Sequence, residues 1–396
     1  MKRYLILALL LTVVILASCS TDAPVQTTDS NITTTTAQGE TLTSTSVITT
    51  TSTLTTTVPV TTTMKEAENN TRQFNSKKGG IYNYCPSIMV CDDGTAYVYY
   101  CTNKDTKRIV DYVGFRKGTV FSNGEIKWGE ESRVLSPTSG SWDAMHTCDP
   151  SVIKGKFNYN SEEYYYLLAY LGCTSTDNQD NKVGLAVAKT PEGPFVKIGD
   201  QPFIDFTMDP TVSVFQWGVG QPSLVSDDKE GKVYLFYTRG DKDGTRTIVE
   251  NWDLSNLNAP ELIKRETLSH KGLVDLNGGG DIINNADFAY DKESGRFYAS
   301  SDCHPMPSDD PNFISTHFRI TSFDPGEGFS DITWTNEYQI GPDDTGFARN
   351  HNTGIVRDEY GYTLPGDEIT VFYTRSLTGP DSLWSYRIYN YTVKKK

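Results

Sequence analysis

Several residues with acid–base potential lie just ahead of apolar runs that read as strands. Asp149 stands directly before Pro150 and an aliphatic run, with His146 three positions earlier. Asp287 occupies a comparable place in a later segment, two residues after Asn285. Two carboxyl groups that face each other can divide the work of acid and base, provided that burial or a neighbouring charge raises the pKa of one of them. We therefore predict Asp149 and Asp287 as catalytic candidates, and the simpler interpretation of Asp149, a turn cap before a proline, stays open.

Cysteines occupy some of the same positions. A nucleophilic thiol at Cys85 or Cys148 would need a neighbouring base such as His146 or His351, and we favour packed thiols or a disulfide instead. Six cysteines lie outside position 19, at 85, 91, 101, 148, 173 and 303, with no tight zinc-binding spacing such as CxxC. Because exported proteins can form disulfides, the sequence leaves both a bridge and free thiols open.

The elements that must position these residues form an internal repeat. Five segments, which begin at 85, 149, 221, 285 and 352, each combine a polar start, an aliphatic strand, an Asp/Gly turn, an aromatic strand and a polar end. The starts are 64, 72, 64 and 67 residues apart, which leaves room for further strands such as 110–118 and 184–195. β-branched and aromatic composition indicates strands. Four strands in each of five units predict an all-β protein, a five-bladed β-propeller, rather than a large β-sandwich.

In a propeller the first strand of every blade lines the central channel, so the five starts meet at one end of it. We call this end the mouth. Asp149 is the best-placed acid there, and Asp281 is a further candidate. Asp143 and Asp209 lie on loops that enter the mouth, and we favour solvated loop acids for both. His304 follows a second strand, and we expect it at the opposite end.

Two stretches resemble glycoside hydrolase family 43 and its five-bladed relatives. KVGLAVAKTPEGPF (182–195) is similar to a family stretch that reads roughly iGvAtSdsPtGPF, and NHNTGIVRDEYG (350–361) to one with a His before an aliphatic strand. The resemblance extends in layout over residues 75–395 and implies a propeller that hydrolyses glycosidic bonds with three carboxylates at blade starts. Here the matching positions are Cys85, Gln221 and Asn285. None is a carboxylate, so the family's chemistry cannot be carried over directly.

The resemblance directs attention to sugar chemistry at the mouth. Two carboxyls roughly 6.5–9.5 Å apart would invert the anomeric centre, and roughly 5–5.5 Å would permit a covalent intermediate. Trp142 and Trp217 lie in polar, Gly-rich contexts ahead of blade starts and are predicted platforms for sugar rings. The remaining predicted substrate-binding residues are polar and lie at or beside blade starts: His146, Gln221, Asn285, Arg349 and His351. By the family likeness His351 could also ligate an ion, and Arg349 could pair with a mouth carboxylate or an acidic sugar.

Residues 1–64 are predicted to lie outside the propeller. A basic start, an apolar run of about thirteen residues, too short to span a membrane comfortably, and the end Leu16-Ala17-Ser18-Cys19 resemble a bacterial lipoprotein signal. Residues 1–18 are therefore a predicted signal peptide, and Cys19 the lipidated residue. Thr accounts for 20 of the 44 residues in 20–63. Such a composition buries too little apolar surface to fold, so 19–64 is a predicted disordered linker and 65–396 the propeller domain.

Charge and composition limit the function. The formal net charge is −14, and residues 64–396 carry about −13 of it, which argues against nucleic acid or anionic lipid bound through a basic patch. We expect a lipid-anchored glycoside hydrolase on the extracellular face of the bacterial cell membrane, acting on a plant or microbial polysaccharide. The alternative is a non-catalytic carbohydrate-binding propeller. Two carboxyls facing each other across the mouth would favour the hydrolase, and aromatics and amides there the binding protein.

The expected partners follow from these hypotheses. They are a polysaccharide or oligosaccharide, and the membrane through the lipid anchor only. No cofactor is required, and the sequence leaves open whether a structural calcium ion lies in the central channel. No dimerisation signal is visible, so we expect a monomer.

Overall fold

The computed structural model describes residues 68–75, 81–103, 108–175 and 179–396, which lie within one compact unit, Thr62–Lys396. The predicted signal peptide, Cys19 and the whole of the predicted linker lie outside the described residues. No helix in the described part of the chain is long and apolar enough to cross a membrane. Apart from helix α1 (Pro342–Thr345) and the 3-10 turn η1 (Leu383–Ser385), the regular elements of that part are strands.

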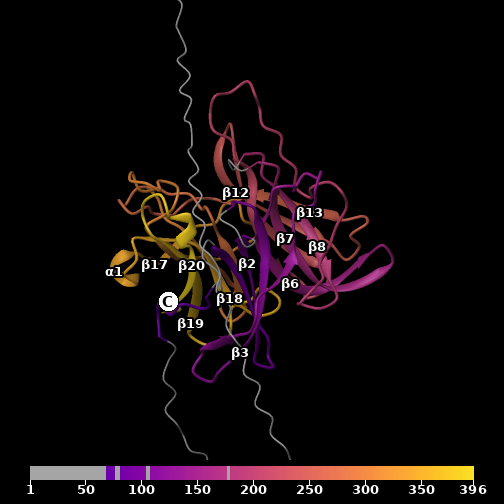
Figure 1. Cartoon of the computed structure of the whole chain (residues 1–396), viewed down its shortest axis with the longest axis horizontal. Coiled ribbons are helices and arrows are strands. Elements are labelled where there is room, and N and C mark those ends of the chain that lie inside the picture. The colour runs from indigo at the N-terminus through magenta and orange to yellow at the C-terminus, as the bar shows by residue number, and fades with distance from the viewer. Residues whose placement is uncertain (1–67, 76–80, 104–107, 176–178) are drawn as a thin grey trace, which may run out of the picture. The chain divides into compact units, whose positions relative to one another are not determined.

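The strands group into five antiparallel units, which we number as blades 1 to 5 in chain order (Figure 1). A parallel pairing of β1 with β18 joins the first and the last of these units into one eight-stranded sheet. Blade 1 contains β1 (Asn83–Val90), β2 (Thr95–Asn103), β3 (Asp111–Val120), β4 (Ile126–Trp128) and β5 (Ser132–Leu135), the last two both paired with β3. Blade 2 contains β6 (His146–Tyr159), β7 (Glu162–Cys173), β8 (Lys182–Ala188) and β9 (Val196–Lys197). Blade 3 contains β10 (Gly218–Ser226), β11 (Lys232–Asp241), β12 (Gly244–Asp253) and β13 (Glu261–Thr267). Blade 4 contains β14 (Asp287–Asp291), β15 (Arg296–Asp302), β16 (Phe318–Phe323) and β17 (Thr335–Ile340). Blade 5 contains β18 (Arg349–Arg357), β19 (Glu368–Ser376) and β20 (Arg387–Lys394).

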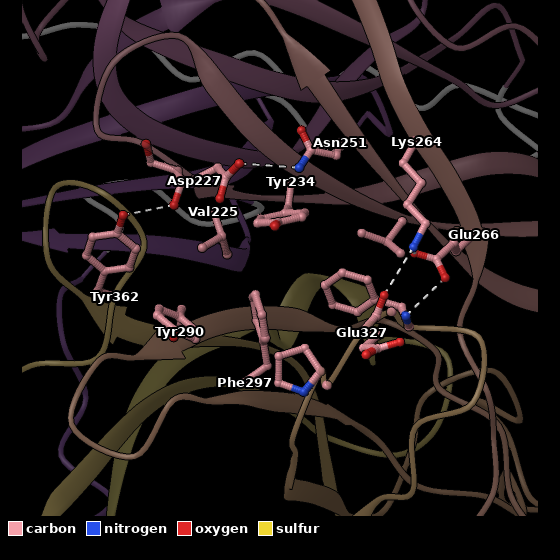
Figure 2. A pocket seen from close by; sticks show the side chains of 16 residues that line it. Val225, Asp227, Tyr234, Asn251, Lys264, Glu266, Tyr290, Phe297, Glu327 and Tyr362 are labelled. Atoms are coloured by element: carbon pink, nitrogen blue, oxygen red, sulfur yellow. Dashed lines mark hydrogen bonds and ion pairs between the residues drawn. The ribbon is translucent and has the colours of Figure 1, made fainter.

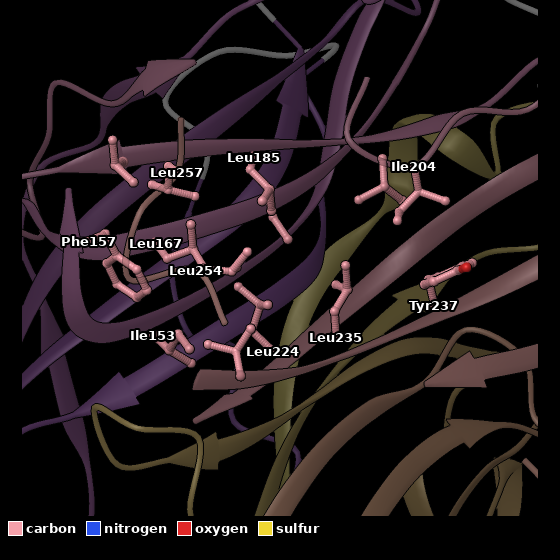
Figure 3. Close-up of a cluster of buried hydrophobic side chains, with 14 of the residues drawn as sticks. Ile153, Phe157, Leu167, Leu185, Ile204, Leu224, Leu235, Tyr237, Leu254 and Leu257 are labelled. Atoms are coloured by element: carbon pink, nitrogen blue, oxygen red, sulfur yellow. The ribbon is translucent and has the colours of Figure 1, made fainter. Parts of the chain in front are cut away.

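One hydrophobic core lies between each pair of neighbouring blades. The core between blades 2 and 3 combines Ile153, Leu167 and Leu185 with Leu224 and Leu235 (Figure 3). Similar clusters join blade 1 to 2, blade 3 to 4 and blade 4 to 5. A fifth joins blade 5 back to blade 1, through side chains of β1, β2, β18, β19 and β20. Because the last blade packs on the first, the sheets close into a ring, and the predicted all-β propeller is confirmed.

Backbone pairing also closes the ring at the junction of blades 5 and 1. β1 pairs in parallel with β18, with Ile88 opposite Val356. In addition, segment 70–73 lies along the outer edge of β20, where the Asn70 N–H donates to the Asn390 carbonyl over 2.9 Å. The start of the domain thus covers the open edge of its last blade, which would otherwise expose unpaired backbone groups.

Candidate functional site

The starts of the five first strands meet at the mouth, as the repeat predicted. Together they line a small pocket of about 20 Å³, room for a single water molecule or ion. The residues at the five equivalent starts are Cys85, Asp149, Gln221, Asn285 and Asn352. The starts therefore present one carboxyl, three amides and one thiol.

These five residues share a strained backbone conformation. Their φ angles are positive, from 44° at Asn352 to 54° at Gln221, although none is a glycine. In four of the first strands the pairing register shifts at this point, as a β-bulge does. Bulges redirect side chains, and left-handed non-glycine residues, at about 1–3 kcal/mol each, concentrate at functional sites. The repeated bulge turns one polar side chain per blade toward the mouth.

A ring of hydrogen bonds fixes each start to the preceding blade. Three of these bonds run from Cys85 N to Thr374 Oγ1 (3.3 Å), from Asn285 N to Gln221 Oε1 (3.0 Å) and from Asn352 N to Asp302 Oδ1 (3.1 Å). The Gln221 N–H donates to the Asp149 carboxyl in the same way. Some of the polar side chains at the mouth therefore hold neighbouring blades together.

A second ring lies two residues further along each first strand. Its serine oxygens accept backbone N–H groups of the next blade, from Val152 to Ser87 (3.3 Å), from Leu224 to Ser151 (2.9 Å) and from Phe288 to Ser223 (3.0 Å). Blade 4 has Asp287 at this place, and blade 5 has Gly354. A Cβ on Gly354 would overlap the carbonyl oxygen of Pro86, so only glycine permits the backbone pairing of β18 with β1.

Asp287 belongs to this second ring. Its carboxylate accepts the N–H of Ile355 over 2.8 Å and the hydroxyl of Ser223 over 2.7 Å, and it forms an ion pair with Arg357 at 3.2 Å. The Arg357 side chain is itself buried. Asp287 lines the mouth pocket, but its oxygens are held by the channel wall, so we assign it to bracing the blades and do not retain it as a catalytic group.

Asp149 combines burial with a place at the pocket. Burial raises the pKa of its carboxyl to about 6. The charge of Asp111 adds to this rise, whereas a hydrogen bond from Cys85 lowers the pKa and offsets part of it. Because this pKa lies close to neutrality, Asp149 can exchange a proton near pH 6.

A carboxyl group that the sequence reasoning missed lies directly behind the mouth. Asp302 ends β15 and is fully buried. Burial raises the pKa of its carboxyl to about 7. Hydrogen bonds from the Asn285 amide, at 2.6 Å, and from the Asn352 N–H lower the pKa and offset part of this rise. The sequence contained one signal for Asp302, since it lies in the polar residues that end the second strand of each repeat.

His304 also lies at the mouth, so its expected place at the opposite end is wrong. The strands of a blade are antiparallel, and the end of the second strand therefore lies beside the start of the first. His304 Nδ1 is 2.8 Å from Asp281, which also pairs with Arg319 at 2.9 Å. Although burial opposes it, the hydrogen bond from His304 and the charge of Arg319 lower the pKa of Asp281 to about 2. The His304 side chain is 24% exposed and oriented by a carboxylate.

His351 is buried on β18, edge-on to Tyr386 at 4.8 Å between ring centres. Burial lowers the pKa of its imidazole to about 3, so the ring is neutral at physiological pH. His351 Nε2 is buried without a hydrogen-bond partner in the described part of the chain, as are Asn350 Oδ1, Asn352 Oδ1 and Thr353 Oγ1. Buried polar atoms normally have partners, so this run of four residues marks a place for a water, an ion or a ligand group.

The cysteines at the mouth include one disulfide. Cys101 of β2 is bridged to Cys148 of β6 and so links blades 1 and 2, while the remaining four of the described cysteines are free. Across the described ranges, one group of three side chains could hold a metal, namely Cys85, Cys101 and Asp149. The bridged Cys101 offers no thiolate, and calcium prefers several oxygen ligands. The ion at His351 and the channel calcium therefore stay predictions.

The predicted His146 lies in a buried network behind the mouth. Its Nδ1 accepts the N–H of Asp111 over 3.1 Å, and the Asp111 carboxylate accepts the hydroxyls of Tyr84, at 3.0 Å, and Tyr82. The Tyr84 hydroxyl is also 2.9 Å from Cys148. This network supports the wall beside Asp149.

The remaining predicted binding residues, Trp142, Trp217 and Arg349, have their side chains engaged by other residues of the propeller. Trp142 is stacked on Tyr170 with ring centres 5.7 Å apart, and Trp217 packs against Gly240, where a Cβ would clash with its indole. Both rings are half-buried. Arg349 is buried and pairs with the loop residue Asp309 at 2.9 Å, rather than with an acid at the pocket.

The loop acids differ from each other. Asp143 is fully buried and ion-paired with Lys197, so its interpretation as a solvated acid is wrong. Asp209 caps a turn through the Thr211 N–H and hydroxyl, as a loop acid commonly does.

Large apolar side chains are exposed on the loops around the mouth. Phe215 precedes β10 and is 64% exposed, and Phe313, between β15 and β16, is exposed to the same extent. Leu377, directly after β19, is also exposed. These loops begin or end at the mouth, so it has apolar surface around a polar floor.

Comparison with known proteins shows which solved structures have a similar fold. No family model matches the chain, and no curated protein matches it. Among solved structures, a family 117 glycoside hydrolase from the marine bacterium Zobellia galactanivorans is similar at 13% identity and a TM-score of 0.50, covering 82% of this chain and 87% of that one. A family 43 β-xylosidase/α-arabinofuranosidase from a compost microbial metagenome, in complex with xylotriose, is similar at 14% identity and a TM-score of 0.51. The match covers 83% of this chain and 95% of that one.

A third similar structure is the exo-β-1,3-galactanase of Phanerochaete chrysosporium with β-1,3-galactotriose, at 16% identity and a TM-score of 0.52. The match covers 82% of this chain and 64% of that enzyme, so the chain spans less than two thirds of its length. At such identities the likeness concerns the fold, and the chain shares the propeller fold of the family 43 and family 117 glycoside hydrolases.

Proposed function

We propose that the chain is a saccharide-binding β-propeller, and that its mouth recognises the hydroxyl groups of a neutral oligosaccharide or polysaccharide. The observation that carries the proposal is the composition of the mouth, where the five blade starts offer three amides, one thiol and the carboxyl of Asp149. Amide side chains contain both donors and acceptors, as sugar hydroxyls require. Fold-level analogy adds to this, since two enzymes of similar fold were solved with xylotriose and β-1,3-galactotriose.

Two further features support a bound saccharide. The unpartnered Asn352 Oδ1 and Thr353 Oγ1 at the pocket would gain hydrogen bonds from sugar hydroxyls. The exposed rings of Phe215 and Phe313 on the surrounding loops offer apolar surface to the C–H faces of sugars. Glycosidic hydrolysis by facing carboxylates is less well supported, because Asp302 is fully buried and Asp287 is held by Arg357.

Hydrolysis remains the second candidate because of one observation. Asp149, with a pKa of about 6, would be largely ionised at neutral pH and suited to act as a base. His304, oriented by Asp281 and partly exposed, would serve as the proton donor. This pair would replace the two carboxyls of the usual mechanism.

The test combines binding and product release on the full chain. Xylotriose and β-1,3-galactotriose would be titrated calorimetrically, and the same mixtures analysed for released sugars. We expect saturable binding that weakens at least tenfold in Asn352→Gly, which keeps the left-handed backbone but removes the unpartnered amide. The exposed Asn258→Ala on blade 3 is the control and should bind as wild type does.

The outcomes separate the candidates. Binding without cleavage supports the binding protein. Cleavage that is lost in both Asp149→Asn and His304→Gln supports the hydrolase. If no probe of this panel or of a wider set of neutral glycans binds or is cleaved, both candidates fail.

We further propose, on the sequence alone, that lipid on Cys19 and the Thr-rich linker tether this propeller to the extracellular face of the membrane. Cys19→Ala should release the protein from the membrane fraction of the producing cell into the medium. Retention of Cys19→Ala in that fraction would contradict the lipid anchor.

A further inference from the structure

We propose a second saccharide site, between blades 3 and 4, that takes one neutral sugar ring and is independent of the mouth. A pocket with a volume of about 340 Å³ lies here, within the usual range of small-molecule sites. At about 30 Å³ for each water molecule in the liquid, this volume corresponds to roughly eleven water molecules. That number is comparable to the roughly twelve non-hydrogen atoms of a hexose unit. The mouth pocket is much smaller.

The pocket faces away from the mouth. It is lined by Val225 and Ser226 near the end of β10 and by Tyr290 near the end of β14. Tyr234 and Phe297, near the starts of β11 and β15, line the pocket at the same end of the blades. Since the first strands begin at the mouth, their ends lie at the opposite face of the propeller. A ligand here would not compete with one at the mouth.

Aromatic rings form the apolar part of the pocket. Figure 2 shows Tyr234 on the side of blade 3 and Tyr290 and Phe297 on the side of blade 4, all three among the lining of the pocket. Tyr234 lies edge-on to Phe297 with ring centres 5.9 Å apart, and to Phe329 at 5.5 Å. Rings held in place by one another offer a rigid surface on which the C–H face of a sugar can pack at little entropic cost.

Polar groups stand at both ends of the aromatic surface. Asn251 donates to Asp227 over 3.4 Å, while its own Oδ1 is buried and has no partner among the residues that the structure describes. At the other end Lys264 pairs with Glu266 at 2.8 Å and reaches the carbonyl of Glu327 at 3.4 Å. A ligand hydroxyl that donates to Asn251 Oδ1 would satisfy an atom whose burial without a partner otherwise costs about 1–3 kcal/mol.

The charge of the lining selects among sugars. Asp227, Glu266 and Glu327 face a single cation, Lys264, which is already paired. An acidic sugar would be repelled by this surplus of carboxylates. Aromatic surface, a free acceptor and net negative charge together fit a neutral hexose or pentose unit.

The experiment titrates the full chain with xylotriose, β-1,3-galactotriose and cellotriose, and with trigalacturonate as the acidic counterpart. We expect at least one neutral probe to bind, and trigalacturonate to bind at least tenfold more weakly. Asn251→Trp, which fills the pocket from its half-buried edge, should abolish this binding event. Tyr234→Phe keeps the ring but removes the hydroxyl that hydrogen-bonds with Asn251 and Asp227. It should weaken binding severalfold, and it guards against an Asn251→Trp variant that fails to fold.

The controls keep this site apart from the mouth. Asn258→Trp adds the same bulk at an exposed position of blade 3 outside the pocket and should bind as wild type does. Asn352→Gly, at the mouth, should leave the binding event intact. If every binding event survives in folded Asn251→Trp and in Tyr234→Phe, or if no neutral probe binds, the second site is overturned, whereas loss in Asn352→Gly alone concerns only the mouth.

Discussion

At the scale of single residues, the carboxyl groups at and behind the mouth are in different electrostatic states. Asp281 is held ionised by His304 and Arg319, whereas burial raises the pKa of Asp149 and Asp302 to about 6 and about 7. Neutral carboxyls can donate as well as accept hydrogen bonds. The mouth can therefore change its donor pattern between about pH 5 and pH 8.

The raised pKa of Asp149 predicts a pH dependence of stability. A carboxyl whose pKa is higher in the folded than in the unfolded state binds more protons when folded, so its stabilising contribution is complete below about pH 4 and is lost as the pH rises through about 6. Relative to Asp149→Asn, the wild-type free energy of unfolding should fall by on the order of 2–3 kcal/mol between pH 4 and pH 7. Urea unfolding at four pH values measures this difference. Asp92→Asn, at an exposed turn, keeps Asp149 and should follow the wild-type pH dependence. Parallel curves for wild type and Asp149→Asn would contradict the assignment.

At the scale of elements, the start of each first strand performs two tasks. The left-handed residue presents a side chain to the mouth, and its N–H is anchored to the preceding blade. In blades 1 to 4, a Ser or Asp two residues later accepts an N–H from the next blade. The recurrence of Pro-Ser in blades 1 to 3 is therefore a requirement of the blade junctions as well as of the site.

Ser223 provides a test of the second ring. Ser223→Ala leaves the buried N–H of Phe288 without its acceptor and removes one donor to Asp287. The free energy of unfolding should fall by about 1–3 kcal/mol, the usual cost of an unsatisfied buried donor. Chemical denaturation measures it, with the exposed Ser330→Ala as a control expected to stay within about 0.5 kcal/mol of wild type. A wild-type value for Ser223→Ala would show that this bond does not hold the blades together.

At the scale of the whole molecule, stability depends on closure of the ring. The core between blades 5 and 1 and the edge pairing of residues 70–73 with β20 join the two ends of the domain. Phe74 follows this segment, is 7% exposed and packs on Tyr100 with ring centres 4.7 Å apart. A residue near the start of the domain thus fills the last junction.

Phe74→Ala should therefore destabilise the complete propeller. A buried Phe replaced by Ala typically costs about 3–5 kcal/mol, and we expect one cooperative thermal transition at a lower midpoint. Phe121→Ala, at a ring that is 48% exposed, is the matched control and should leave the midpoint nearly unchanged. Equal midpoints for the two variants would mean that the N-terminal segment does not contribute to closure.

The sequence by itself determined the architecture of this protein, because the five repeats, their turns and their aromatic strands are local patterns. The starts at 85, 149, 221, 285 and 352 are the residues that meet at the mouth. Tertiary structure decided which of them are free to act. Asp287 is held by Arg357, seventy residues further on, and Asp302 and His304 reach the mouth only because antiparallel strands return there. Ion pairs, burial and the pocket between blades 3 and 4 arise from contacts between distant segments, and one sequence read in order does not contain those distances.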